Sequence, residues 1–171
     1  MRRLIIVGII AAAVVTGIWF FVQAANRPAD PYFAPTVGGF EEQAFSIAAP
    51  GEGGRGDEHC ALLAATAEQR GRGLMGRRDL GGYDGMVFRF DRVVTTPFTM
   101  SRTLIPLSIA WFDASGELVD QAEMIPCPEA VSCPSYRADG PYLYALEVAQ
   151  GGLDKLGVAT GSHLILGNGC A

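Results

Sequence analysis

The chain has 171 residues, and its 13 basic and 18 acidic side chains give a net charge of −5. Once an apolar leader is set aside, the rest has the length of one domain, which can bury a hydrophobic core without a structural metal. Without Arg2 and Arg3, the two charges of the first 25 residues, the net charge falls from −5 to −7, and this acidic balance argues against a nucleic-acid partner, because phosphate binding needs clustered basic residues.

The first predicted element is an apolar helix over residues 4–22, which contain no charged side chain and follow Arg2 and Arg3. About 20 apolar residues span the hydrocarbon core of a membrane, and the preceding positive charge favours an orientation with the rest of the chain outside the cytoplasm. Residues 1–25 are therefore expected to be a signal anchor. The alternative is a cleaved signal peptide, with Val22 and Ala24 at the −3 and −1 positions of the cleavage site. The domain would then be secreted or periplasmic.

Residues 26–42 are predicted to be a linker, because Pro28 and Pro31 disfavour regular structure there. An extracytoplasmic domain is expected over residues 43–171. Thr66 is expected to cap a short helix that carries Arg70, and residues 152–157 to form a helical turn. Short apolar or alternating segments predict strands at 43–48, 59–65, 86–90, 98–103, 107–112, 118–125, 142–148 and 163–166. Many short strands with few helices indicate a mainly β sandwich or barrel.

The four cysteines, Cys60, Cys127, Cys133 and Cys170, agree with export, since disulfides persist outside the cytoplasm. Four cysteines allow three pairings. Cys127 and Cys133 flank a short loop that contains proline, which favours a bond between them and leaves Cys60 for Cys170. The alternative is a metal site that adds the two histidines, but zinc ligands usually come in pairs two to four residues apart, and this spacing does not provide them. We therefore predict two disulfides and no metal.

Several short motifs, in a fixed order from about Cys60 to Leu166, resemble domain-of-unknown-function family 192. The resemblance implies a compact β-rich, jelly-roll-like domain with one or two short helices, in a family whose members are often secreted or anchored. It implies no activity and no catalytic residue. The motifs are Arg70-x-Arg72-Gly73-Leu74-Met75, Gly85-Met86-Val87-Phe88, Phe98-x-Met100-x-x-Thr103-Leu104-Ile105-Pro106-Leu107, Met124-x-Pro126-Cys127, Cys133-Pro134-x-Tyr136 and Leu146-Glu147.

The chain departs from the family pattern at three polar positions. Where the family usually has Trp-Met-Lys-Asn-Thr and then Pro-Leu-Asp, the sequence reads Thr99-Met100-Ser101-Arg102-Thr103 and then Pro106-Leu107-Ser108. The lysine, the asparagine and the aspartate are missing. If those polar groups form a site in the family, this chain has altered it.

Four arginines, Arg70, Arg72, Arg77 and Arg78, form a basic cluster in an acidic domain. Guanidinium groups suit carboxylate and phosphate, so the cluster could hold an anionic ligand; the alternative is a solvated loop whose arginines pair with nearby acids. Residues 71–76 also match G-x-G-x-x-G. A dinucleotide fingerprint needs a strand before it and a helix after it within a parallel crossover unit, which the sequence does not indicate, so we interpret the glycines as a turn.

Glu147 lies on the same face of its predicted strand as Leu143 and Ala145. If that face points inward, the carboxyl group is partly buried and needs a partner, for which Arg70 and Arg102 are the candidates. Such a buried pair is more often structural than catalytic.

Other catalytic arrangements have weaker support in the sequence. A carboxylate pair for glycoside hydrolysis could be drawn from Asp113, Asp120, Glu123 and Glu147, but no spacing selects one. His59 and His163 have no partner readable from the sequence, and there is no G-x-S-x-G motif.

The sequence therefore predicts an extracytoplasmic ligand-binding or accessory domain without a cofactor, bound to the membrane through residues 4–22 or released. A small molecule or an envelope component is the expected ligand. Residues 70–75 and 98–103 are expected to form the rim of its site. The alternatives are a hydrolase or carbohydrate-active enzyme and a structural envelope protein. The candidate ligand-binding residues are Arg70, Arg72, Met75, Met100, Arg102, Thr103 and Glu147.

Overall fold

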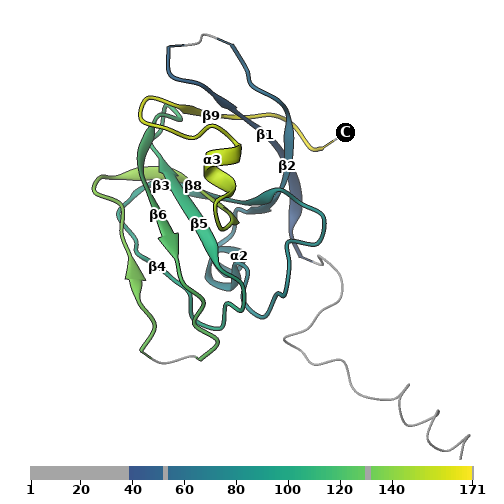
Figure 1. Cartoon of the computed structure of the whole chain (residues 1–171), viewed down its shortest axis with the longest axis vertical. Coiled ribbons are helices and arrows are strands. Elements are labelled where there is room, and N and C mark those ends of the chain that lie inside the picture. The colour runs from purple at the N-terminus through teal and green to yellow at the C-terminus, as the bar shows by residue number, and fades with distance from the viewer. Residues whose placement is uncertain (1–38, 52–53, 130–131, 171) are drawn as a thin grey trace, which may run out of the picture. The chain divides into compact units, whose positions relative to one another are not determined.

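A sheet of seven strands forms the framework of the domain (Figure 1). The structure, a computed structural model, describes residues 39–51, 54–129 and 132–170. The strands of the sheet are β1 (Glu41–Ala48), β2 (His59–Ala64), β3 (Gly85–Val94), β5 (Leu107–Phe112), β6 (Leu118–Met124), β8 (Tyr142–Ala149) and β9 (His163–Leu166). Their order across it is β6-β5-β8-β3-β2-β1-β9. Two further strands pair with each other, β4 (Phe98–Thr99) and β7 (Ser135–Tyr136), and the helices are α2 (Ala67–Arg72) and α3 (Gly152–Lys155).

The mainly β prediction with two short helices is confirmed, but the sheet is a curled half-barrel and not a two-sheet jelly roll. Its edge strands, β6 and β9, meet at one corner. There the backbone N–H of Leu118 donates to the Ser162 carbonyl (2.9 Å), and that of Leu164 donates to the Gly116 carbonyl (2.8 Å). Register irregularities in β3 and between β5 and β6 accompany the curl.

The expected leader at residues 4–22 lies outside the described residues, as does most of the expected linker. Across residues 39–51, 54–129 and 132–170, no helix is both long and apolar enough to cross a membrane.

β2 and β3 pair in parallel, with Leu62 opposite Met86 and Ala64 opposite Phe88. Parallel neighbours need a crossover connection, and α2 with the turns after it supplies one. The sequence did not indicate this crossover, because a helix of six residues followed by glycine-rich turns does not have the pattern of a crossover helix. The G-x-G-x-x-G segment begins within α2 and continues as turn, whereas a dinucleotide fingerprint precedes its helix.

Both faces of the central strands are buried, because alternate side chains of a strand point to opposite sides of the sheet. Along β8, Leu146 and Val148 belong to one core cluster, which α3 covers through Leu153. Ala145 belongs to a second cluster, covered by residues of β4 and of the turn after α2. Glu147 alternates with Leu146 and Val148 and therefore faces the second cluster.

The two predicted disulfides are present. Cys60 in β2 is bonded to Cys170, with Cα atoms 5.7 Å apart, and Cys127 is bonded to Cys133 ahead of β7, with Cα atoms 5.8 Å apart. Ligand atoms of Glu42, Cys60 and Cys170 lie within 4.8 Å of one another. Because both sulfurs are in the disulfide, neither is the thiolate that a metal would need.

Gly85 begins β3 at a point where a side chain has no room. A Cβ atom on Gly85 would lie 2.4 Å from the backbone oxygen of Glu147 in β8. Gly85→Ala is expected to displace β3 from β8 and to lower the free energy of unfolding by about 1–3 kcal/mol. Gly71 is the matched control, because it lies in α2 and its Cβ would meet nothing within 4 Å. Gly71→Ala is expected to raise that free energy by about 0.5–1 kcal/mol. Urea unfolding measures both changes, and equal stability of the two variants would contradict the close approach.

Candidate functional site

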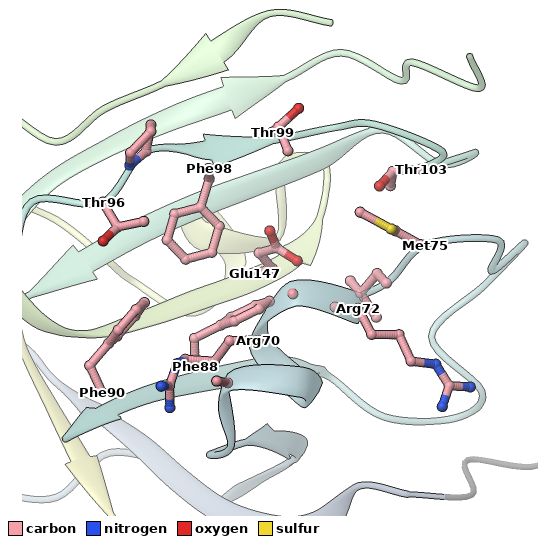
Figure 2. A pocket seen from close by; sticks show the side chains of 15 residues that line it. Arg70, Arg72, Met75, Phe88, Phe90, Thr96, Phe98, Thr99, Thr103 and Glu147 are labelled. Atoms are coloured by element: carbon pink, nitrogen blue, oxygen red, sulfur yellow. The ribbon is translucent and has the colours of Figure 1, made fainter. Parts of the chain in front are cut away.

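A pocket of about 330 Å³ lies between α2, β3 and the segment from Thr96 to Thr103. Figure 2 shows the side chains around it. It borders the second core cluster, so its floor is the central part of the sheet. The lining residues are Ala67, Arg70, Gly71, Arg72, Gly73, Leu74, Met75, Phe88, Phe90, Thr96, Pro97, Phe98, Thr99, Thr103 and Glu147.

Three phenylalanines form the apolar walls of the pocket. Phe88 and Phe90 are two residues apart in β3 and lie on one face of it, and Phe98 in β4 packs against both. The ring centroids of Phe88 and Phe98 are 5.0 Å apart and those of Phe90 and Phe98 are 6.5 Å apart, both edge to face. Tyr142 extends the cluster toward Phe90, with centroids 5.4 Å apart. Its hydroxyl donates a hydrogen bond to the Thr96 carbonyl. Edge-to-face pairs are favourable beyond their burial, so the walls have a defined shape.

Glu147 supplies the one carboxyl group among the described residues of the lining. It lies in β8 at the centre of the sheet, where its backbone is paired with Met86 of β3 and Ile109 of β5. The residue is 5% exposed, and Figure 2 shows its carboxyl group in the middle of the lining side chains. Within the described residues, this side chain has neither a hydrogen bond nor an ion pair.

Burial raises the pKa of Glu147 to about 8, because the charged form loses its hydration and gains no partner. At neutral pH the free protein therefore holds mostly a protonated carboxyl group. Such a group can donate a hydrogen bond into the pocket, or it can give up its proton to a ligand that stabilises the carboxylate.

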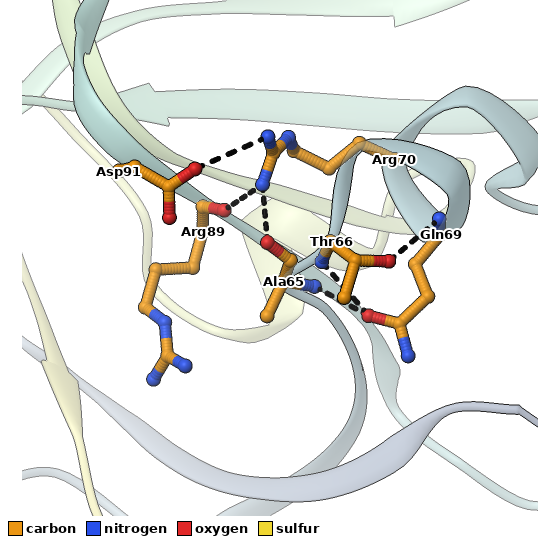
Figure 3. A network of polar contacts seen from close by, with 6 residues as sticks. All are labelled: Ala65, Thr66, Gln69, Arg70, Arg89 and Asp91. Atoms are coloured by element: carbon orange, nitrogen blue, oxygen red, sulfur yellow. Dashed lines mark hydrogen bonds and ion pairs between the residues drawn. The ribbon is translucent and has the colours of Figure 1, made fainter.

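Arg70 does not pair with the buried carboxyl group, so that candidate partner was wrong. Its guanidinium group donates hydrogen bonds to the carbonyl oxygens of Ala65 and, at 2.9 Å, Arg89, and it lies 3.6 Å from a carboxylate oxygen of Asp91 (Figure 3). It also lies over the Phe90 ring, 4.9 Å from the centroid. These contacts join α2 to the end of β2 and to β3. Arg70 thus fixes one wall of the pocket.

The predicted cap of α2 is confirmed and holds the same helix from its other end. The Thr66 hydroxyl accepts a hydrogen bond from the Gln69 backbone N–H (3.2 Å), and the Gln69 side-chain oxygen accepts one from the Thr66 backbone N–H (2.9 Å). This reciprocal capping box satisfies N–H groups that the first turn of a helix leaves unpaired (Figure 3).

Five of the seven predicted ligand-binding residues line the pocket: Arg70, Arg72, Met75, Thr103 and Glu147. The Arg72 guanidinium group points away from the carboxyl group in Figure 2 and lies over the ring of Phe40, 5.6 Å from its centroid. Two predicted residues do not belong to the lining. Met100 is 1% exposed and packs in the core, and Arg102 is exposed to solvent.

The aromatic walls were missing from the sequence-based set of residues. Two phenylalanines at alternate positions of one predicted strand, Phe88 and Phe90, carry a signal for a shared face. The contact of Phe98 with both depends on how β4 packs across the sheet, which no local pattern reveals. The strand expected at residues 98–103 is shorter than predicted, Phe98–Thr99, because Arg102 adopts a positive φ of 57° and the chain turns.

The other acidic candidates lie outside the pocket lining. In the turn after β5, the hydroxyl and the backbone N–H of Ser115 both donate hydrogen bonds to the Asp113 carboxylate. These bonds, above all the one from the hydroxyl, lower the pKa of Asp113. Asp120 accepts a backbone hydrogen bond from Asp139 (3.1 Å). Glu123 accepts one from the hydroxyl of Ser108 (2.6 Å). Among the described lining residues, no second carboxyl group accompanies Glu147, so this pocket does not contain the two-carboxylate arrangement of a glycosidase.

The two histidines also lie apart from the lining. His59 Nδ1 lies 3.4 Å from a carboxylate oxygen of Asp84, beside the disulfide of Cys60, and His163 opens β9 at the far edge of the sheet. Neither contacts the carboxyl group of the pocket.

A family model described as Uncharacterized ACR, domain-of-unknown-function family 192, matches residues 51–166. The chain belongs to this family. Family 192 motifs contribute Met75, Phe88, Phe98, Thr103 and Glu147 to the pocket. Of the family positions that are changed in this chain, Ser101, Arg102 and Ser108 are not among the lining residues, whereas Thr99, where the family usually has tryptophan, is one of them.

Two solved structures resemble this family 192 member. A protein of unknown function from Novosphingobium aromaticivorans DSM 12444 shares 27% identity with a TM-score of 0.62, over 83% of this chain and 96% of that one. A protein from Sinorhizobium meliloti 1021, described as a candidate transcription regulator, shares 24% identity with a TM-score of 0.62, over 74% of this chain and 95% of that one. A comparison with curated protein sequences returns no significant match.

Proposed function

We propose that this protein is an extracytoplasmic ligand-binding domain, anchored to the membrane or secreted, whose pocket holds a small organic molecule at Glu147. The observation that carries the proposal is the buried carboxyl group on the central strand, which has no partner among the described residues. Leu146-Glu147 is also one of the motifs by which the sequence resembles the family.

An unpaired carboxyl group in this position lowers the stability of the free protein. Desolvating a polar group without a hydrogen bond costs a few kcal/mol, and an apolar side chain of similar volume in the same place often makes the folded protein more stable. In folded proteins nearly all buried polar groups have a partner. A bound molecule that contacts the carboxyl group would supply the missing partner, which supports a binding site here.

The size and lining of the pocket also support a small ligand. Its volume of about 330 Å³ is at the lower end of the range for small-molecule sites, roughly 300–1,000 Å³. Three phenyl rings give it apolar walls, and Glu147, Thr96, Thr99 and Thr103 give it a few polar groups. This mixture is typical of sites that bury an apolar body and orient it through a small number of hydrogen bonds.

Two features support a location outside the cytoplasm. Residues 4–22 have the length and apolar character of a membrane-crossing helix, and Arg2 and Arg3 precede them. The domain contains two disulfides, which persist mainly in oxidising compartments. Separation of membrane and soluble fractions, with sequencing of the mature N-terminus, distinguishes an anchored from a released domain.

Ligand-observed NMR tests the proposed pocket on the full chain in detergent micelles, with a set of small neutral and cationic fragments. We expect some fragments to bind and to show intermolecular NOEs to Phe98. Glu147→Leu is expected to lower their affinities about tenfold or more, because it removes the polar contact. Glu117→Gln, which changes an exposed carboxyl group outside the pocket, is the control and should leave the affinities unchanged. Fragments that all fail to bind, or that bind Glu147→Leu equally well, would refute the proposal.

A further inference from the structure

We infer that the ligand of this pocket carries an organic cation, an alkylammonium or arylammonium group, which pairs with the Glu147 carboxylate against the phenylalanine walls. This inference rests on the proposed ligand-binding function and assigns the chemical class of the ligand.

The charged groups around the carboxyl group leave its negative charge uncompensated. Arg70 and Arg72, both from α2, are the basic residues of the lining, and each has other contacts. Arg70 pairs with Asp91 and with backbone carbonyls, and Arg72 lies over Phe40. The other described lining residues, from β3 and from the segment between residues 96 and 103, carry no titratable side chain. The carboxylate therefore has no counter-ion within the described residues, and the group that best compensates a buried negative charge is a positive one.

The phenylalanine walls also favour a cation. Phe88 and Phe98 stand edge to face beside the carboxyl group, with centroids 5.0 Å apart. The face of an aromatic ring attracts a cation through its quadrupole, and aromatic rings with a nearby carboxylate are a common way to bind ammonium groups. An aliphatic wall would exclude water equally well but would not favour a cation over a neutral molecule of the same shape.

The proton of Glu147 distinguishes a cationic from a neutral ligand. A cation that enters the pocket stabilises the carboxylate, so Glu147 passes its proton to the buffer as the complex forms. The raised pKa of the free carboxyl group means that a proton is present to be released at neutral pH. A neutral ligand that accepts a hydrogen bond would instead keep the proton on Glu147. The two ligand classes therefore differ in the direction of their pH dependence.

Two matched pairs of compounds test the inference on the full chain: choline with 3,3-dimethylbutan-1-ol, and benzylammonium with benzyl alcohol. Each pair has nearly the same shape and differs in charge. Isothermal titration calorimetry at pH 7 and pH 9, in buffers of different ionisation enthalpy, gives the affinity and the number of protons released. We expect at least one cation to bind about tenfold or more tightly than its neutral partner, with proton release at pH 7 and higher affinity at pH 9.

Two variants locate the preference. Glu147→Gln keeps the size and the hydrogen-bonding capacity of the side chain without the charge, and is expected to abolish the preference for the cation while leaving the neutral compound bound. Phe98→Leu keeps an apolar wall but removes the aromatic ring. It is expected to lower the affinity for the cation roughly 2- to 10-fold and to change the affinity for the neutral compound little. Glu117→Gln is again the control.

The outcomes separate this inference from the proposed function. Neutral compounds that bind as tightly as the cations, without proton release and still dependent on Glu147, would overturn the cation inference and leave the ligand-binding function standing. If neither these compounds nor the wider fragment set binds, both are refuted. A cation preference that survives in Glu147→Gln would also overturn the inference.

Discussion

Replacing Glu147 by glutamine is expected to raise the free energy of unfolding by roughly 5 kcal/mol at pH 9 and to change it little at pH 4. An unfolded chain has its glutamates near the ordinary pKa of 4.5, whereas in the folded protein the pKa of Glu147 is about 8. Between these two values the folded state holds a proton that the unfolded state has lost. The contribution of Glu147 to stability is therefore fully present below pH 4.5 and is lost progressively as the pH rises to about 8, by about 1.4 kcal/mol per pH unit.

Urea unfolding of the wild type and of Glu147→Gln from pH 4 to pH 9 measures this difference. Other groups titrate over the same range, but they are common to both proteins, so the difference between the two curves isolates Glu147. Glu117→Gln is expected to follow the wild-type curve within about 0.5 kcal/mol, because exposed substitutions have small effects. Parallel curves for the wild type and Glu147→Gln would show that the carboxyl group is hydrated or paired.

Loss of the Cys60–Cys170 disulfide is expected to lower the free energy of unfolding by about 5 kcal/mol in the chain-entropy model, since the bond joins residues 110 apart. The Cys127–Cys133 bond joins residues 6 apart, and the same model gives it about 2 kcal/mol. The double variants Cys60→Ala/Cys170→Ala and Cys127→Ala/Cys133→Ala form a matched pair, and urea unfolding compares them. A smaller loss for the long-range bond than for the short one would contradict the entropic account.

The short disulfide matters for the pocket as well as for stability. Cys127 forms isolated backbone bridges with Ser101 and Thr103, and the bonded loop leads through Cys133 into β7, which pairs with β4. β4 carries Phe98. The loop therefore holds the segment that forms one wall of the pocket, and the family motif around these cysteines has a structural explanation.

The sequence predicted the strands and the disulfides well because their signals are local. The short, mostly apolar segments at residues 107–112 and 163–166 predicted strands with the same bounds as β5 and β9. The cap at Thr66 was readable from its residue type and from the Gln69 that follows it. The disulfide pairing followed from the loop between Cys127 and Cys133, and four cysteines left one further bond.

What the sequence could not supply were relations between distant segments. The parallel pairing of β2 with β3 depends on a crossover built from a six-residue helix and glycine turns, and neither has a crossover pattern of its own. The sequence placed Glu147 on one face with Leu143 and Ala145 and, if that face were buried, suggested Arg70 or Arg102 as the partner of its carboxyl group. Arg70 instead reaches the carbonyl oxygens at the end of β2 and in β3, and this choice depends on how α2 packs.

The structure shows what the residues at the changed polar positions of the family pattern contact. Ser108 stands where the family usually has an aspartate, and its hydroxyl donates to Glu123 (2.6 Å) and accepts from the Gly151 backbone N–H (2.9 Å). It thereby holds the start of the α3 segment against β5. Ser101 and Arg102 lie in the turn after β4. These three replacements therefore lie outside the pocket lining, whereas Thr99, where the family usually has tryptophan, belongs to it.

The ionisation of Glu147 itself tests most directly whether this side chain is buried and unpaired at the base of a ligand pocket. In the full chain, labelled with ¹³C at the glutamate carboxyl groups, the resonance of Glu147 can be assigned by its loss in Glu147→Gln. We predict a titration midpoint near the pKa of about 8, which falls when a saturating organic cation is added. A midpoint near the ordinary 4.5, unchanged by any ligand, would contradict the account.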